Sequence, residues 1–255
     1  MGEAKANLSR LIRERDPICI YCGTAPSDDA DHCPPKVIFT GKDRPKGLEF
    51  GICKDCHAPT RAIDQIAAGY GRMMPPPKTG AEKADIRKYA KGMVNNYVEV
   101  ARIFGGASRI NNQGLHVIEV NGDDGERLHN AMLAFSARLG MALYREIVGK
   151  PVDREAHIFA RYFSSGNIAM DEFPDHLFEG LQNPRTLRAG RKHKTGEFLY
   201  DHMYDGERFL GFAMIRESFA SLVMITPEAP DGEPGLGRMF RPGFLRGFDW
   251  RRVEQ

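Results

Sequence analysis

The stretch that decides the fold contains three short motifs: CIYCG at residues 19–23, DHCPP at 31–35 and CKDCH at 53–57. Two Cys-x-x-Cys pairs therefore enclose a loop that carries an Asp-His pair. In a reducing compartment this spacing favours metal binding over disulfide formation. Zinc prefers four tetrahedral thiolate or imidazole ligands, and each pair presents two of them. We predict a structural zinc ion with these ligands: Cys19, Cys22, Cys53 and Cys56.

The fifth cysteine and the overall composition carry less information. Cys33 is left without a partner and is most simply a small, buried packing residue. Hydrophobic residues make up 42% and charged residues 27% of the 255 residues, as is usual for a soluble globular protein. The net charge of +2 excludes a global polycation. Because the N-terminus has no apolar signal region and no apolar stretch approaches the roughly 20 residues that span a bilayer, we expect a cytoplasmic protein without a membrane partner.

Changes in composition and periodicity divide the chain into five expected parts. They are a leader helix over 1–16, a cysteine-rich module over 17–72, a proline-rich linker over 73–80, an α+β domain over 81–226 and a tail rich in Pro, Gly and Arg over 227–255. The linker is expected to be stiff because a proline run cannot continue a helix. The tail is expected to be loose.

The 81–226 part is predicted to contain two long helices and a mostly antiparallel sheet. Apolar residues at helical spacing predict helices over 86–104 and 128–147, and a shorter helix is expected over 172–181. The apolar period then shifts toward strands, which are predicted at about 156–163, 197–204, 207–215 and 218–226. The fold class is therefore α+β, with the sheet packed against one or two helices.

The stretch from about 17 to 72 resembles the HNH endonuclease family, in the branch of the ββα-metal nucleases that carries a four-cysteine zinc site. That pattern is a Cys-x-x-Cys pair, an acid-His dyad, a loop, an apolar strand, and a second pair that opens a helix and is followed by His or Asn. This chain supplies Asp31-His32, the strand 48–52, and His57 directly after Cys56. The resemblance covers about a fifth of the chain and implies a zinc-stabilised ββα fold.

The resemblance also implies catalytic roles. His32 would be the general base that activates water for attack on a phosphodiester, a task that suits an imidazole near neutral pH. Asp31 and His57 would hold one catalytic divalent ion, Mg²⁺ or Mn²⁺, separate from the zinc. The alternatives for these residues are an ordinary surface Asp-His turn and a histidine that merely neighbours the zinc.

Two departures from the family pattern favour a module that has lost catalysis. The middle Asn of the HNH pattern is missing, since the region before the second strand reads RPKGL at 44–48. The position after the second pair that often bears Lys is Thr60, with Arg61 beside it as the expected phosphate contact. Asp64, one turn beyond, is either an additional acid or a solvated residue.

Two basic segments further along the chain are candidate nucleic-acid contacts. The first is a loop with five cationic residues: Arg185, Arg188, Arg191, Lys192 and Lys194. Such a loop can grip phosphates, but it can equally be a solvated hairpin. The second is the tail, in which arginines alternate with aromatic residues over 238–252 and could bind single strands or a partner protein.

The sequence therefore predicts a metal-dependent HNH-like endonuclease that cleaves DNA, with the 81–255 part selecting the target or a protein partner. The rival prediction is a catalytically degenerate HNH-type zinc module that serves as a nucleic-acid- or protein-binding scaffold, as in phage or anti-phage-defence proteins. His32 beside an acid favours the first prediction. The missing Asn favours the second.

Overall fold

The computed structural model describes residues 3–39, 45–73, 77, 79–106, 108–110, 116–118, 120, 122–169, 185–186, 197–229 and 237–253. The helices are α1 (Glu3–Arg15), the 3-10 helix η1 (Lys36–Ile38), α2 (Lys54–Met73), α3 (Gly80–Asn96), α4 (Val98–Ile103), α5 (Asp123–Val148) and α6 (Ser165–Ala169). The strands are β1 (Asp29–His32), β2 (Glu49–Ile52), β3 (Ser108–Ile110), β4 (His116–Ile118), β5 (His157–Ser164), β6 (Arg185–Thr186), β7 (Phe198–Tyr204), β8 (Phe209–Ile215), β9 (Phe219–Thr226) and β10 (Arg238–Phe240). The α+β class is confirmed.

The cysteine-rich module is a ββα unit. Strands β1 and β2 pair antiparallel, with Asp31 opposite Phe50 and His32 opposite Glu49. Phe50 and Ile52 are fully buried, which accounts for the strand predicted there. Helix α2 begins directly after β2, and its apolar side packs into the core through Ile63, as the sequence pattern predicts.

The larger sheet has six strands in the order β10-β5-β9-β8-β7-β6, and every neighbouring pair is antiparallel. Strands β7, β8 and β9 form a meander joined by tight turns. In the first turn Asp205 accepts hydrogen bonds from the backbone N–H groups of Glu207 and Arg208, and Gly206 has a φ of +104° that favours glycine. The predicted mostly antiparallel sheet is confirmed.

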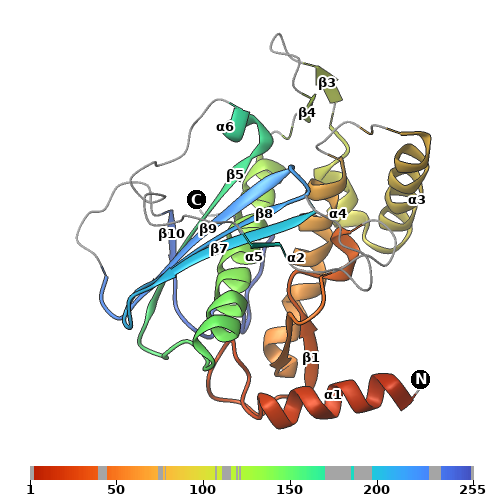
Figure 1. Cartoon of the computed structure of the whole chain (residues 1–255). Coiled ribbons are helices and arrows are strands. Elements are labelled where there is room, and N and C mark those ends of the chain that lie inside the picture. Colours follow the sequence, from red (N-terminus) through yellow and green to blue (C-terminus); the bar gives the residue numbers. More distant parts are fainter. Residues whose placement is uncertain are drawn as a thin grey trace.

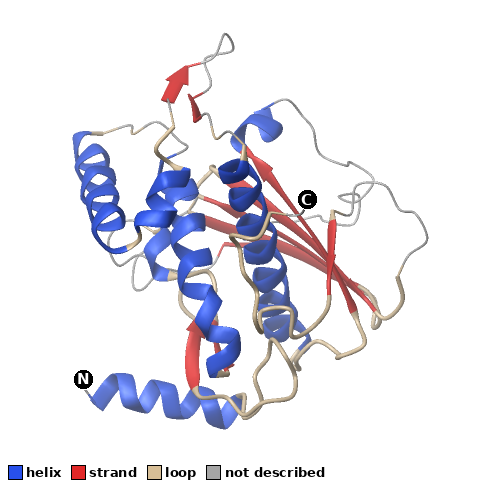
Figure 2. Cartoon of the chain, turned by 180° about the vertical axis from the view of Figure 1, so that it is seen from behind, coloured by secondary structure: helices blue, strands red, loops and turns tan. Residues whose placement is uncertain are grey.

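Helix α5 is the central element of the molecule. It lies between one face of the sheet and helix α2 (Figures 1 and 2). On the sheet side, the Ser136 hydroxyl lies 2.8 Å from that of Ser221 on β9, and Gly140 packs directly against Val223. An α-helix buried on all sides is apolar all round, and nearly every residue of α5 from Ala131 to Tyr144 is buried.

A single hydrophobic core extends from the zinc module through α5 to the inner face of the sheet, and it includes Phe50, Phe135 and Val223. The opposite face of the sheet carries a small second cluster around Phe163 and Leu222. Side chains alternate between the two faces of each strand, which explains this division.

Two expectations about the C-terminal part are corrected by the structure. The helix predicted over 86–104 is two helices, α3 and α4, because Tyr97 leaves the helical region with a φ of −140° and a ψ of 59°. The tail is not loose over residues 237–253: Phe240, Leu245 and Trp250 are buried against the core. The helix expected over 172–181 lies outside the described residues.

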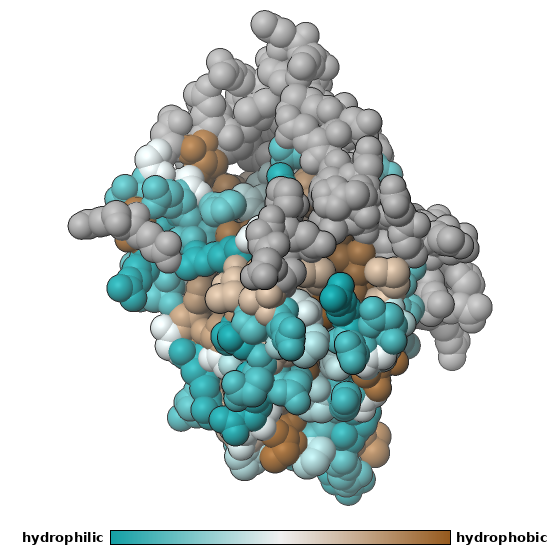
Figure 3. Space-filling model, turned by 90° about the vertical axis from the view of Figure 1, so that its left-hand side faces the viewer, coloured by the Kyte–Doolittle hydropathy of each residue, from teal (hydrophilic) through white to brown (hydrophobic). Residues whose placement is uncertain are grey.

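None of the described helices combines the length and apolar character that a membrane span requires. On the side of the molecule at the left of Figure 1, the described surface is mainly hydrophilic, with scattered hydrophobic groups (Figure 3).

The close approach of α5 to the sheet predicts an effect of substitution at Gly140. A Cβ atom there would lie 2.3 Å from Cγ1 of Val223, so Gly140→Ala should lower the free energy of unfolding by about 1–3 kcal/mol. Gly92 in α3 is the matched control, because no atom lies within 4 Å of its added Cβ. Gly92→Ala should stabilise the protein by up to about 1 kcal/mol. Urea unfolding of both variants checks the prediction, and equal effects would contradict it.

Candidate functional site

The four predicted zinc ligands converge in the folded chain. One ligand atom from each of Cys19, Cys22, Cys53 and Cys56 lies within 4.8 Å of the others, and all four residues are buried. The Sγ atoms of Cys22 and Cys53 are 3.9 Å apart, close to the edge of about 3.8 Å that a tetrahedron with Zn–S bonds of about 2.3 Å requires. The cluster can therefore hold a metal ion such as zinc, as the spacing predicts.

Each cysteine pair is positioned by local backbone bonds. In the first pair the N–H of Gly23 donates to the carbonyl of Cys19, and Gly23 has a φ of +63° that a side chain would strain. In the second pair Cys53 ends the β2 segment and Cys56 lies in the first turn of α2. The two pairs are brought together by β2, because the N–H of Ile20 donates to the carbonyl of Gly51.

Hydrogen bonds among the thiol groups of the cluster shift their pKa values in opposite directions. A hydrogen bond from Cys56 lowers the pKa of Cys19 to about 5, and the same bond raises the pKa of Cys56. Zinc binds thiolates and displaces these protons. The cluster is thus arranged so that thiolate formation is already favoured at one ligand.

Asp31 lies beside the zinc module's core and is engaged in a buried ion pair. Its carboxylate accepts from Arg138 of α5 through two bonds, Nε to Oδ2 at 3.0 Å and Nη2 to Oδ1 at 2.7 Å. Oδ2 also accepts from the hydroxyl of Tyr21 at 2.5 Å. The Arg138 side chain is 0% exposed and Asp31 is 3% exposed. The remaining guanidinium nitrogen, Nη1, pairs with Asp64 of α2.

One guanidinium therefore faces two acidic side chains. Burial alone would raise the pKa of Asp31, but the charge and hydrogen bonds of Arg138 outweigh burial and lower that pKa. Arg138 stabilises the ionised form of Asp64 less than it stabilises that of Asp31. Burial and the negative charge of Asp31 therefore raise the pKa of Asp64 to about 7. Asp31 is thus ionised at neutral pH, whereas Asp64 titrates there.

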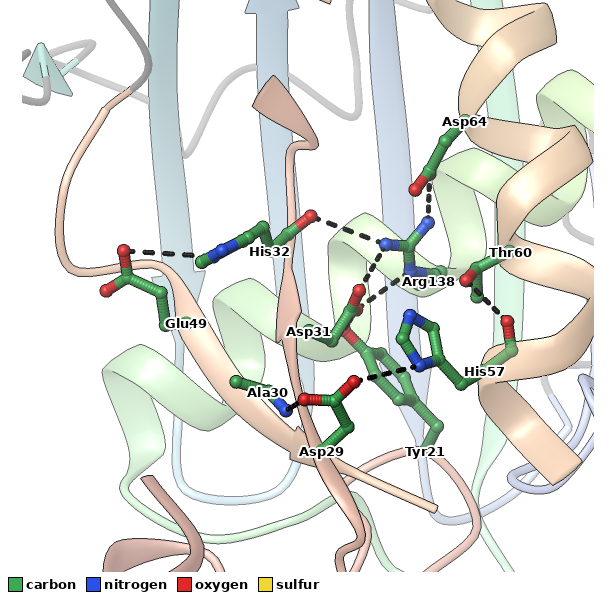
Figure 4. A network of polar contacts seen from close by, with 10 residues as sticks. All are labelled: Tyr21, Asp29, Ala30, Asp31, His32, Glu49, His57, Thr60, Asp64 and Arg138. Atoms are coloured by element: carbon green, nitrogen blue, oxygen red, sulfur yellow. Dashed lines mark hydrogen bonds and ion pairs between the residues drawn. The ribbon is translucent and has the colours of Figure 1, made fainter. Parts of the chain in front are cut away.

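The two histidines predicted to act together lie on different sides of β1. His32 extends toward Glu49, with Nδ1 3.8 Å from the Oε1 of Glu49, while Asp31 lies on the other side of the strand with His57 and Arg138 (Figure 4). His57 has its Nδ1 3.7 Å from Oδ2 of Asp29. Alternation along β1 explains the division, because residues 29 and 31 share one face and residue 32 the other.

The described residues do not fit a divalent ion at Asp31 in this arrangement. An ion bound to its carboxylate would lie beside the buried guanidinium of Arg138, which already contacts both oxygens. Among the described residues, the four cysteines are the only group of three or more His, Cys, Asp or Glu residues with converging ligand atoms. The metal-ligand role of Asp31 and His57 stays a prediction.

Only some of the residues predicted to contact nucleic acid lie in the part of the chain that the structure describes. Arg61 is exposed on α2, next to Thr60, whose hydroxyl donates to the carbonyl of His57. Within the basic loop, Arg185 lies in the short strand β6. Arg188, Arg191, Lys192 and Lys194 lie outside the described residues.

Two residues central to the site were not predicted from the sequence. Asp29 could have been found, because it precedes Asp31 by two positions and shares its face of the strand. Arg138 left a weaker signal, a single arginine within the apolar run AFSARLGMAL of residues 134–143. A charged residue in a helix buried all round needs a partner, but the sequence did not indicate which one.

Comparison with protein-family models, with curated proteins and with solved structures found no match to this chain. The resemblance to the HNH family therefore rests on the residues and the geometry described above.

The zinc assignment predicts about one zinc ion per chain in protein purified without added metal. Cys22→Ser or Cys53→Ser should lose the ion and unfold the 17–72 module, because metal binding contributes much of the folding free energy of such a unit. Cys33→Ser is the matched control, since Cys33 is also buried but lies outside the cluster and should keep zinc. Elemental analysis checks the stoichiometry. Full zinc in the Cys22 and Cys53 variants would disprove the assignment.

The raised pKa of Asp64 predicts a pH-dependent stability. The folded pKa of about 7 exceeds the ordinary value of 3.8, so folded protein binds a proton that unfolded protein releases between these values. This contribution is fully present below about pH 4 and is lost as the pH rises through 7. The free energy of unfolding of the wild type should therefore fall relative to Asp64→Asn between pH 5 and 8. A constant difference in urea unfolding would contradict the pKa.

Proposed function

We propose that the protein is a zinc-stabilised nucleic-acid-binding protein, built on an HNH-like ββα module that has lost metal-dependent hydrolysis. DNA is the expected ligand. The observation that carries the proposal is the buried ion pair of Asp31 with Arg138, which engages the acid on which a catalytic ion would depend. Removing one partner of a buried ion pair is costly, so Asp31 is not readily released to bind an ion.

The architecture supports the HNH-like part of the proposal. A strand bearing Asp31-His32, a second antiparallel strand and a helix that begins at the second cysteine pair follow one another in the order of the family pattern. The convergent cysteines lie at the junction of these three elements. His57 lies in the first turn of the helix, where the resemblance places it.

The surface of the module supports contact with nucleic acid. Lys36, Lys46, Lys54 and Arg61 are exposed on it. Their charges are available to phosphates, although exposed acids such as Asp29 and Asp55 limit the net attraction. Binding of this kind is sequence-independent and weakens as salt is added.

The second candidate function is the endonuclease itself, and His32 favours it. Its side chain is 29% exposed and pairs with Glu49, an arrangement that can orient an imidazole as a general base. In this candidate His32 would accept a proton from a water molecule on the Glu49 side of β1, and that water would attack the phosphodiester. Asp31 would then support the strand and would not bind an ion.

Binding and cleavage measurements separate the two candidates. In fluorescence anisotropy with labelled DNA and RNA, the affinity should not change on addition of Mg²⁺ or after brief EDTA treatment. In a cleavage assay, plasmid DNA should stay intact with Mg²⁺, Mn²⁺ or Ni²⁺. His32→Ala should bind as the wild type does. Arg61→Glu should weaken binding and reduce the salt slope by about 1. Arg208→Glu, in the exposed β7–β8 turn, is the control with the same charge change.

Each contrary outcome points to a specific alternative. Divalent-dependent cleavage that falls by about 10²-fold in His32→Ala would establish the endonuclease instead. No binding to DNA or RNA at low salt would overturn the nucleic-acid proposal and leave a protein partner as the ligand class.

A further inference from the structure

The guanidinium of Arg138 occupies a cation site between β1 and α2. Asp31 of β1 binds two of its nitrogens, Asp64 of α2 binds the third, and the carbonyl of His32 lies 3.4 Å from Nη2. Figure 4 shows the guanidinium enclosed by these groups, with His57 beside Asp31. Its hydrogen-bond partners are two carboxylates and one carbonyl, all of them acceptors, as a cation requires.

The charges of the site match a divalent ion better than they match a guanidinium. Asp31 and Asp64 together carry two negative charges when both are ionised, and Arg138 supplies only one positive charge. Burial raises the pKa of Asp64 most, and the negative charge of Asp31 adds to the shift. Hard divalent ions prefer carboxylate oxygens, and facing elements provide two carboxylates: Asp31 is buried, and Asp64 is partly buried, with 18% of its side chain exposed.

The guanidinium that fills the site comes from a distant part of the chain. Arg138 is 107 residues from Asp31, and it lies on the face of α5 opposite to Ser136 and Gly140, which pack on the sheet. Arg145, two helical turns further along, pairs at 2.6 Å with Asp16, which precedes the module and whose Oδ2 accepts from the N–H of Gly51 in β2. Two arginines on one face of α5 therefore hold the zinc module against the helix.

We propose that Arg138 fills this cation site in cis, in place of a divalent ion, and that the site formed by Asp31 and Asp64 binds a divalent cation or free guanidinium once the arginine side chain is removed. The inference rests on one part of the proposed function, namely that the module binds nucleic acid without an ion at Asp31. Because the guanidinium of Arg138 takes the place of a divalent metal ion, it also attaches the module to α5.

Cation rescue of Arg138→Ala tests the proposal. The variant should melt at a lower temperature than the wild type, and either Mn²⁺ or guanidinium at about tenfold excess over its Kd should raise the melting temperature by about 3–5 °C. Guanidinium at about 10 mM is far below denaturing concentrations. Arg145→Ala is the matched control, because its partner Asp16 provides one carboxylate, and Mn²⁺ should not rescue it. Neither cation should stabilise the wild type.

Direct Mn²⁺ binding, followed by electron paramagnetic resonance on zinc-loaded protein, identifies the ligands. Arg138→Ala should bind one Mn²⁺ that is lost in the double variants with Asp31→Asn or Asp64→Asn. Where Arg138→Ala does not fold alone, refolding with Mn²⁺ or guanidinium should recover it, while Arg138→Lys should fold without either. The proposal would be overturned if neither cation stabilised Arg138→Ala or recovered its folding. It would also be overturned if the wild type bound Mn²⁺ and Asp31→Asn abolished that binding. Nucleic acid takes no part in these measurements, so their failure is distinct from failure of the proposed function.

Discussion

The ion pair between Arg138 and Asp31 is the constraint on which the arrangement of this molecule depends. A guanidinium with no exposed surface is stable only where carboxylates and hydrogen bonds replace its lost hydration. Asp31 and Asp64 supply them from two elements of the zinc module, and Tyr21 completes the shell of Asp31. A polar contact within a largely apolar core therefore helps to fix the position of α5, and through it that of the sheet.

The cysteine cluster, which can hold a metal ion such as zinc, and this ion pair connect the module to its neighbours at two separate places. The cysteines join the first loop to the start of α2, a connection that a unit of this size needs because its own apolar core is small. The ion pair joins β1 and α2 to α5. The tail adds a third contact, since the N–H of Gly243 donates to the carbonyl of Tyr21 beside the first cysteine pair. The module is consequently part of one continuous core with the sheet.

This integration bears on function. A catalytic ββα module needs an acid free to hold an ion next to its general base, and here Asp31 and His32 have different partners on different faces of β1. Arg138 supplies the positive charge internally, with no surface available to a substrate. The structure thus uses Asp31 for its own stability, through a buried ion pair with Arg138. The exposed cationic residues of the module remain available to phosphates.

The sequence by itself predicted the cysteine cluster, the meander strands and the range of α5, because each follows from local spacing or periodicity. The ββα order was implied by the resemblance to the HNH family. Cysteine pairs at fixed spacing, a two-residue period over 197–226 and a helical period over 128–147 are all readable within a short window. The break at Tyr97 and the packing of the tail could not be predicted from the sequence. In the tail, neither Phe240 nor Trp250 indicates which surface it will cover. Only the tertiary structure decided what Asp31 does. Its partner lies 107 residues away, and the choice between a metal ion and a guanidinium depends on which face of a buried helix meets β1.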